Sequence, residues 1–214
     1  MSKPETATGD ATATLVYAEQ VATLYRLAPF TLAMSIVAAT FTWLLLDVAG
    51  AATSLMGWML AHHAVILGRY AVIRAYRRAA PSPAGARRWA LLFVAGTVAT
   101  GFVWGLVGTV FRPPEGHALA GVAIVIVFAV AAVGLFTLGA LFPAYAGLAI
   151  PALAPALVSL MISSEPSDRS YGIVVGVFLF VALSNARRAA RSFAEFPAAA
   201  DRDRAHRGGA RTGP

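Results

Sequence analysis

The sequence has 214 residues, of which 58% are hydrophobic and 13% charged, about half the charged share of an ordinary soluble domain. A water-soluble fold of this size could not bury so much apolar surface, so a soluble globular domain is excluded. The formal net charge is +7, but the basic residues flank apolar segments in short groups instead of forming a nucleic-acid-binding face. Cysteine is absent, which excludes disulfides, thiolate metal sites and cysteine nucleophiles.

Six apolar stretches qualify, or nearly qualify, as membrane spans, for which a helix needs about 20 residues. In chain order they are 27–48, 51–70, 89–111, 117–138, 140–162 and 171–186. The turn between the first two is so short that they predict a helical hairpin. The weakest boundary is Leu138 to Phe142, which contains no charge and only Gly139 as a breaker before Pro143. A merged or re-entrant segment is the alternative there.

The placement of arginine predicts the orientation of the helices, because Lys and Arg accumulate in cytoplasmic loops. With the N-terminus inside, fifteen of the 17 basic residues fall on the inner side, and only Arg112 and Arg169 on the outer side. Two clusters carry most of this bias: Arg74, Arg77, Arg78, Arg87 and Arg88 after the second stretch, and Arg187, Arg188 and Arg191 after the sixth. The sequence therefore predicts an all-α, polytopic membrane helix bundle of six transmembrane helices with both termini in the cytoplasm.

Three regions follow from this interpretation. Residues 1–26 form a cytoplasmic N-terminal segment, 27–186 the transmembrane domain, and 187–214 a basic cytoplasmic tail. The tail is expected to be mostly disordered, because its charged, glycine-bearing sequence cannot bury an apolar face. Before it, Asn185 to Phe196 could continue the sixth helix as an amphipathic extension until Pro197 stops it.

The second stretch carries the first candidate site, because ionisable side chains inside a bilayer are costly. At 100° per residue, the candidate residues Trp58, His62 and Arg69 share a narrow stripe with Tyr76 that should face the bundle interior, while His63 points away. One hypothesis is a site for a small ligand, a quinone or a haem. The alternative is that His62 hydrogen-bonds a neighbouring helix and fixes packing. No second histidine or acidic ligand lies at matching depth, so neither a metal nor a cofactor is expected.

The fifth stretch contains a row of helix breakers four residues apart, Pro143, Gly147, Pro151 and Pro155. Each proline removes a backbone donor and frees a carbonyl one turn back, so a partner must satisfy that acceptor. Such a helix is bent or locally unwound, and broken helices often line binding cavities. Pro151 and Pro155 are therefore further candidate ligand-binding residues. A static kink with helix packing is the alternative.

Two GxxxG motifs indicate close approach between helix backbones. They are formed by Gly101 with Gly105 and by Gly172 with Gly176. Packing within the bundle explains these four glycines at least as well as the formation of a homodimer.

The signatures of common enzymes are missing. The sequence contains no phosphate-cradling glycine loop with a lysine, no HExxH, no GxSxG and no paired carboxylates within a span. We therefore expect that the chain is not an enzyme. Asp47, the only acidic residue near a span, sits at an outer end, which counts against a proton-coupled transporter.

Several short motifs between residues 17 and 193 are similar to those of one family of membrane sensors. They are the LYRLAP segment of 24–29, Gly68-Arg69-Tyr70 with Arg74, Trp89 opening the third stretch, Gly101-x-x-Trp104-Gly105, and PAYAGLAIPALAPALVSL of 143–160. In this order they resemble the N-terminal membrane-sensor region, of the MASE-like type, of bacterial diguanylate cyclases and hybrid histidine kinases.

The resemblance implies a sensor or membrane anchor in the bacterial inner membrane. In such proteins the last helix leads through a coiled-coil linker into a GGDEF or kinase output domain. This sequence departs from that pattern, because a short arginine-rich tail without heptads follows the sixth stretch. Output would then come from a separate cytoplasmic GGDEF or kinase protein, unless the chain is truncated.

The leading functional prediction is thus a sensory module that binds a small or lipophilic signal between its helices. The proline-broken fifth helix, packed against the Trp58, His62 and Arg69 stripe, would pass a movement through Ala186 to Phe196. Expected partners are the lipid bilayer, a second copy of the chain and the separate output protein, but not nucleic acid. The alternatives are a small transporter or permease and a structural membrane partner without a ligand.

Overall fold

Helices make up almost all of the chain that the structure, a computed structural model, describes. It describes residues 5–48, 55–113, 117 and 119–209, with side chains over 12–47, 55–113, 117 and 119–193. The helices are α1 (Glu5–Val48), α2 (Leu55–Ala79), α3 (Ala86–Val107), α4 (Ala120–Leu138), α5 (Phe142–Ile162) and α6 (Pro166–Gly209), with a 3-10 turn η1 (Pro83–Gly85) before α3. No strand occurs in these residues, which confirms the prediction of an all-α fold.

Five of the helices in the described residues are long and apolar enough to cross a membrane. They are α1 over Thr12–Asp47, α3 with the preceding turn over Pro83–Val107, α4, α5, and α6 over Pro166–Phe193. The chain is therefore a multi-pass membrane protein. The helix α2 has 25 residues, enough to span a bilayer, but it carries His62, His63 and Arg69, which make it less apolar.

The outer surface of the bundle is apolar, as the surroundings of a lipid-embedded protein require. Only 22% of the apolar window of α1 and 17% of that of α6 is buried in the protein. Large side chains such as Phe30, Phe136 and Phe180 are 71%, 86% and 73% exposed. Soluble monomers rarely expose continuous apolar surface of this kind, so hydrocarbon chains of a bilayer fit this surface better than water.

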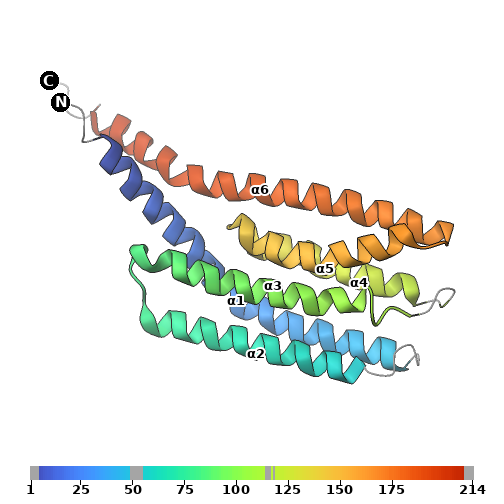
Figure 1. Cartoon of the computed structure of the whole chain (residues 1–214). Coiled ribbons are helices and arrows are strands. Elements are labelled where there is room, and N and C mark those ends of the chain that lie inside the picture. The colour runs from blue at the N-terminus through green and yellow to red at the C-terminus, as the bar shows by residue number, and fades with distance from the viewer. Residues whose placement is uncertain (1–4, 49–54, 114–116, 118, 210–214) are drawn as a thin grey trace.

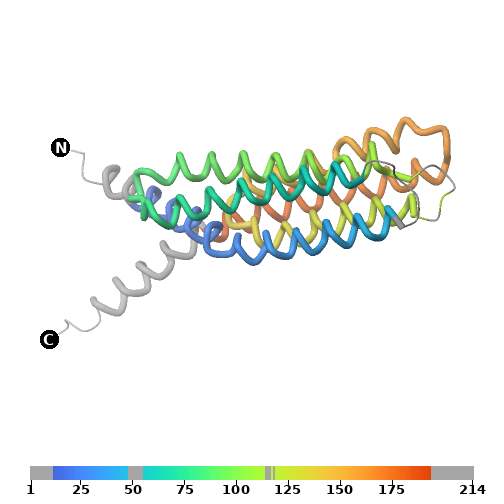
Figure 2. The backbone as a smooth tube through the Cα atoms, turned by 90° about the horizontal axis from the view of Figure 1, so that it is seen from below, coloured from blue at the N-terminus to red at the C-terminus, as the bar shows by residue number. Residues whose placement is uncertain are grey.

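The helices run side by side along one long axis (Figures 1 and 2). The α2–α3 connection, the first part of α1 and the far part of α6 lie at one end of the bundle (Figure 1), which we call the basic end. There the Gln20 side-chain amide donates to the backbone oxygen of Ala190 over 3.1 Å and joins α1 to α6. Both predicted arginine clusters belong to this end.

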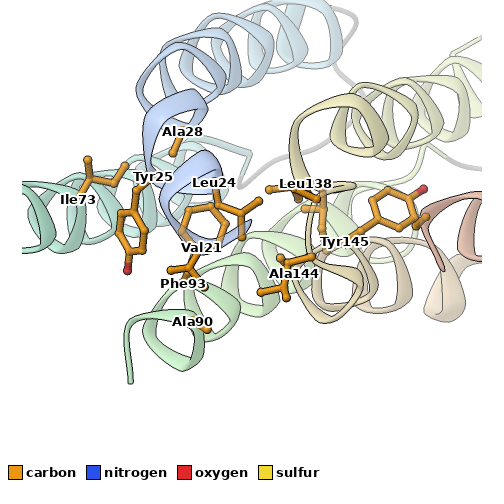
Figure 3. Packing of buried hydrophobic residues seen from close by; sticks show 14 of the residues in the cluster. Val21, Leu24, Tyr25, Ala28, Ile73, Ala90, Phe93, Leu138, Ala144 and Tyr145 are labelled. Carbon is orange, nitrogen blue, oxygen red and sulfur yellow. The ribbon is translucent and has the colours of Figure 1, made fainter. Parts of the chain in front are cut away.

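The bundle core has two parts, one toward each end. The basic-end core draws buried side chains from α1 to α6, and Figure 3 shows some of them from α1 to α5. In it, the Tyr25 ring stacks on Tyr76 with 3.8 Å between centroids, and the Tyr25 hydroxyl donates to the backbone oxygen of Trp89 over 3.0 Å. These contacts tie α1, α2 and α3 together. The second core, around Trp58, Trp104 and Leu153, lies toward the opposite end.

An ion pair closes the end opposite to the basic end. Both terminal nitrogens of Arg112 donate to the carboxylate of Asp168, over 3.0 and 2.5 Å. The two side chains are only 12% and 5% exposed, so this bidentate pair is shielded from solvent. It joins the segment after α3 to the first turn of α6.

The structure confirms one predicted helix boundary and changes two others. The uncertain Leu138 to Phe142 segment is a true break, because α4 ends at Leu138 and Leu141 is extended before α5 starts. The first helix begins at Glu5, so most of the predicted segment 1–26 is continuous with the first span. The sixth helix was predicted to stop at Pro197, but it continues to Gly209. Side chains beyond residue 193 are not described, so the character of the basic tail stays a prediction.

The two GxxxG motifs both pack against α5. A Cβ added to Gly101 would lie 2.5 Å from the backbone oxygen of Leu148 and 3.0 Å from that of Gly147, and one on Gly105 would collide with the oxygen of Pro151. The oxygens of Gly147 and Pro151 are those that Pro151 and Pro155 free by lacking an N–H. Close approach of α3 therefore covers the acceptors that the proline row leaves open, with Cα–H groups as weak donors.

We predict that Gly101→Ala lowers the free energy of unfolding by about 1–3 kcal/mol, because a methyl group has no room against the rigid α5 backbone. Gly176→Ala is the matched control, since its Cβ would lie 3.5 Å from the flexible Leu157 side chain, an ordinary contact. Unfolding by SDS in mixed micelles measures both. Equal stability of the two variants would contradict the tight α3–α5 contact.

Ala80, the residue directly after α2, has a positive φ of 39°. An L side chain is strained in this left-handed region, and the following Pro81 restricts the residue further. Ala80→Gly should therefore stabilise the protein by about 0.5–1 kcal/mol. Ala75→Gly, an exposed position within the same helix, should instead destabilise it by about 1 kcal/mol. Thermal unfolding in detergent distinguishes the two, and destabilisation by both would refute the strained C-cap.

Candidate functional site

A cavity of about 290 Å³ lies between α1 and α4, with α3 behind it. We call it the α1–α4 cavity. The helix α1 lines it with one face, and the outermost of these residues, Thr31 and Thr42, are eleven positions apart, so the cavity follows α1 for about 16 Å. The helix α4 supplies an apolar wall: Ile126, Ala129, Val130, Val133, Gly134 and Leu138. Met34, Phe41 and Val133 are 45%, 62% and 55% exposed, so the cavity borders the lipid-facing surface.

Polar groups gather on the wall of this cavity that faces away from lipid. Arg69 of α2 reaches it, and its terminal Nη1 donates to the Thr100 hydroxyl over 3.0 Å. The Thr100 hydroxyl in turn donates to the Gly96 backbone oxygen over 2.8 Å. One turn further along α3, the fully buried Trp104 also lines the cavity, and its indole N–H has no hydrogen-bond partner among the described residues.

Arg69 crosses the bundle because Gly96 leaves room for its stem. A Cβ on Gly96 would lie 2.9 Å from the Arg69 Cγ, so any larger residue there would push this side chain aside. The guanidinium carbon also lies 5.4 Å from the centre of the Phe93 ring, a cation–π contact. Arg69 further lines a second cavity, of about 350 Å³, between α2 and α3. The side chain is thus the wall between two cavities.

The charge of Arg69 has no carboxylate partner within the described part of the chain. The ion pairs there are Arg26 with Glu19, on the exposed surface, and Arg112 with Asp168. A cation in an apolar setting without a counter-ion is electrostatically unfavourable, and the hydroxyl and ring contacts compensate for it only in part. Arg69 is therefore the group in this cavity most in need of an additional acceptor.

Trp58 and His62 face the bundle interior as predicted, being 2% and 0% exposed, but neither lines the cavity. The Trp58 indole donates to the Val103 backbone oxygen over 2.6 Å. The His62 Nε2 lies 3.0 Å from the Ser35 hydroxyl of α1, which lines the cavity. His62 thus bonds a neighbouring helix, as the packing alternative expects, and supports the cavity wall from behind. His63 instead bonds within α2, through Nδ1 at 2.7 Å from the Met59 oxygen.

Pro151 and Pro155 lie apart from the cavity. Pro155 is exposed, Pro151 is half-buried, and neither lines the cavity. The expectation that the fifth helix packs against the Trp58, His62 and Arg69 stripe is wrong, because α2 packs on α1 and α3, and no Cα of α2 lies within 8 Å of a Cα of α5 in the described residues. The physical reason is the glycine face of α3, which takes up the α5 backbone and leaves α3 between the two helices.

Four residues that shape the site were not among the predicted candidates: Ser35, Gly96, Thr100 and Trp104. The sequence carried two signals for them. On α1, Thr31, Ser35 and Thr42 recur at intervals of four and seven residues, which places them on one face of a helix. On α3, Gly96, Thr100 and Trp104 follow one another every four residues. Small or polar residues with helical spacing inside an apolar stretch thus mark an interior face.

Among the described residues, no group of three or more histidine or acidic side chains is placed to hold a metal ion. The polar groups of the α1–α4 cavity are hydrogen-bond donors and hydroxyls, which suit an organic ligand that carries acceptors.

We predict that Ser35 and His62 are energetically coupled. In a double-mutant cycle of Ser35→Ala and His62→Leu, the coupling should be about 0.6 kcal/mol and at most about 1.7 kcal/mol, the range of interhelical hydrogen bonds in membranes. SDS-induced unfolding gives the stabilities of the wild type, the two single variants and the double variant. His62→Leu with Thr40→Ala is the control cycle, because the Thr40 hydroxyl donates to the Ile36 oxygen of its own helix over 3.0 Å. No coupling in the Ser35 cycle, or a coupling no larger than that of the control, would refute the interaction.

Known proteins offer no match from which a function for this site could be transferred. No protein-family model, no curated protein and no solved structure matches the chain. The resemblance to MASE-like sensor regions therefore stays a proposal.

Proposed function

We propose that the chain is a sensory module of the bacterial inner membrane that binds a lipophilic signal in the α1–α4 cavity and relays it through α6. The observation that carries this proposal is a cavity bordering lipid, with an arginine on its inner wall that has no counter-ion within the described residues. Ionisable groups at such a depth are costly, so their presence favours a functional use.

The proposal includes six spans with both termini in the cytoplasm. In support, α2 is long enough to cross, and it packs directly on α1 and α3. The tyrosine and tryptophan contacts at the basic end are of the kind found at a membrane interface. The gathering of both arginine clusters at that end agrees with a cytoplasmic location for it (Figure 1).

The route of transmission runs through α1, in place of the α5 route expected from sequence. The same helix lines the cavity and continues to the basic end, where Gln20 bonds the Ala190 oxygen of α6. A ligand that spreads α1 from α4 would therefore shift α1 against α6. From there α6 continues beyond the described side chains, toward a separate GGDEF or kinase protein as the proposed receiver.

A test of the relay does not require the natural ligand, because a larger side chain can fill the cavity. Ala129→Phe adds a ring to the α4 wall, and Ala33→Phe adds the same ring at an exposed position of α1 that does not line the cavity, as control. Spin labels on cysteines introduced at Ala13 and Arg188 report the α1–α6 distance by electron–electron resonance, since the native chain has no cysteine.

Ala129→Phe should shift the Ala13–Arg188 distance by about 1–2 Å, the size of typical helix shifts in signalling proteins. Ala33→Phe should leave it unchanged. An unchanged distance in both variants argues against transmission and favours a structural partner protein without a ligand. Solute uptake by proteoliposomes that is lost in Ala129→Phe would instead favour the transporter alternative.

A further inference from the structure

We propose that the ligand of the α1–α4 cavity is a single-chain amphiphile with a carboxylate head, such as a free long-chain fatty acid, and that Arg69 binds the carboxylate. This inference rests on the proposed function only in taking the cavity as a binding site. It adds the chemical class of the ligand and the residues that recognise it.

The donors in the cavity favour an anionic head. The Arg69 guanidinium has five N–H donors and uses one of its terminal nitrogens for Thr100. The Trp104 N–H, one turn further along α3, is covered by protein atoms, so Arg69 is the cation that supplies donors to a head at this wall. A neutral acceptor would accept hydrogen bonds from Arg69 but would not neutralise its charge. A carboxylate satisfies both, and its geometry matches the guanidinium in a bidentate pair.

The remainder of the cavity favours an aliphatic chain. Its other polar side chains are already engaged, since the hydroxyls of Thr31 and Thr42 donate to carbonyls of α1 and Ser35 pairs with His62. What remains for a ligand is apolar contact along α1 and the α4 wall. The volume of about 290 Å³ lies at the low end of the range for ligand pockets, which suits one chain better than a two-chain lipid.

The second cavity beside Arg69 is the less suitable place for the head. Apart from Arg69, its polar lining is the Tyr25 hydroxyl, which already donates to the Trp89 oxygen. The Arg69 stem also lies over Gly96 there, while the terminal Nη1 reaches Thr100 at the α1–α4 cavity. The positive head of the side chain is thus directed to the cavity between α1 and α4.

Brominated fatty acids provide a direct test, because bromine quenches tryptophan fluorescence at short range and Trp104 lines the cavity. Protein in phosphatidylcholine nanodiscs is titrated with dibromostearic acid at a pH where it is ionised, and with its methyl ester as the uncharged probe. The acid should quench saturably, with an affinity about tenfold or more above that of the ester, as expected for charge-assisted hydrogen bonds.

Three variants separate the contributions of charge, space and background. Arg69→Gln should weaken binding of the acid about tenfold or more and leave the ester unaffected. Arg74→Gln, an exposed arginine on the same helix, is the matched control and should bind like the wild type. Ala129→Phe should reduce binding of both probes, because it occupies the chain site, and it serves as the second arm where Arg69→Gln does not fold.

Equal affinity for acid and ester, or equal loss in Arg69→Gln and Arg74→Gln, would overturn the proposal. Saturable quenching that Ala129→Phe leaves intact would also overturn it, since the ligand would then lie elsewhere. These outcomes are distinct from those of the relay test. Carboxylate binding without a change in the α1–α6 distance would support the ligand class and contradict the sensory role. A changed distance without preference for the carboxylate would support the sensory role and contradict the ligand class.

Discussion

The close backbone contact between α3 and α5 is the constraint on which the rest of the bundle depends. Two glycines of α3 lie against carbonyls that the prolines of α5 leave without an internal donor. In a bilayer such carbonyls must find a partner inside the protein, since lipid offers none. With one face of α3 bound to α5 in this way, the neighbouring face, with Gly96, Thr100 and Trp104, is turned toward α2 and the cavity.

The same constraint explains why a charged side chain can exist at this depth. Gly96 of α3 leaves room for the stem of Arg69. One turn further along α3, the Thr100 hydroxyl accepts a hydrogen bond from the Arg69 guanidinium. The Arg69 side chain is therefore held by the space above Gly96 and by its contact with the Thr100 hydroxyl. The absence of a counter-ion would make the proposed site selective for anionic ligands, because an uncharged lipid chain does not neutralise Arg69.

Sequence reasoning succeeded where a property belongs to one helix at a time. Apolar run lengths predict the helices, and the spacing of Trp58 and His62 predicts which side of α2 is buried, because both depend only on helical periodicity. Even the uncertain break after Leu138 follows a local cue, Gly139 before Pro143.

It failed where a property depends on which helices are neighbours. The sequence predicts that the proline-containing fifth helix packs against the stripe on α2. In the bundle, α3 lies between α5 and α2. The cavity was equally inaccessible to sequence reasoning, because it arises from the spacing between α1 and α4 and from no single motif. The polar spacing of Thr31, Ser35 and Thr42 was present in the sequence, but its meaning appears only once α2 and His62 lie beside it.

The buried ion pair of Arg112 and Asp168 has a mechanical consequence for α6. It anchors the first turn of this helix at the end opposite to the basic end and would be the hinge in the proposed movement of α6, which packs along α5. A helix of 44 residues is about 66 Å long, so a tilt of about 2° at the hinge displaces the far tip by about 2 Å. In the proposed relay, the length of α6 would convert a small disturbance inside the membrane into a larger movement at the far end of the helix.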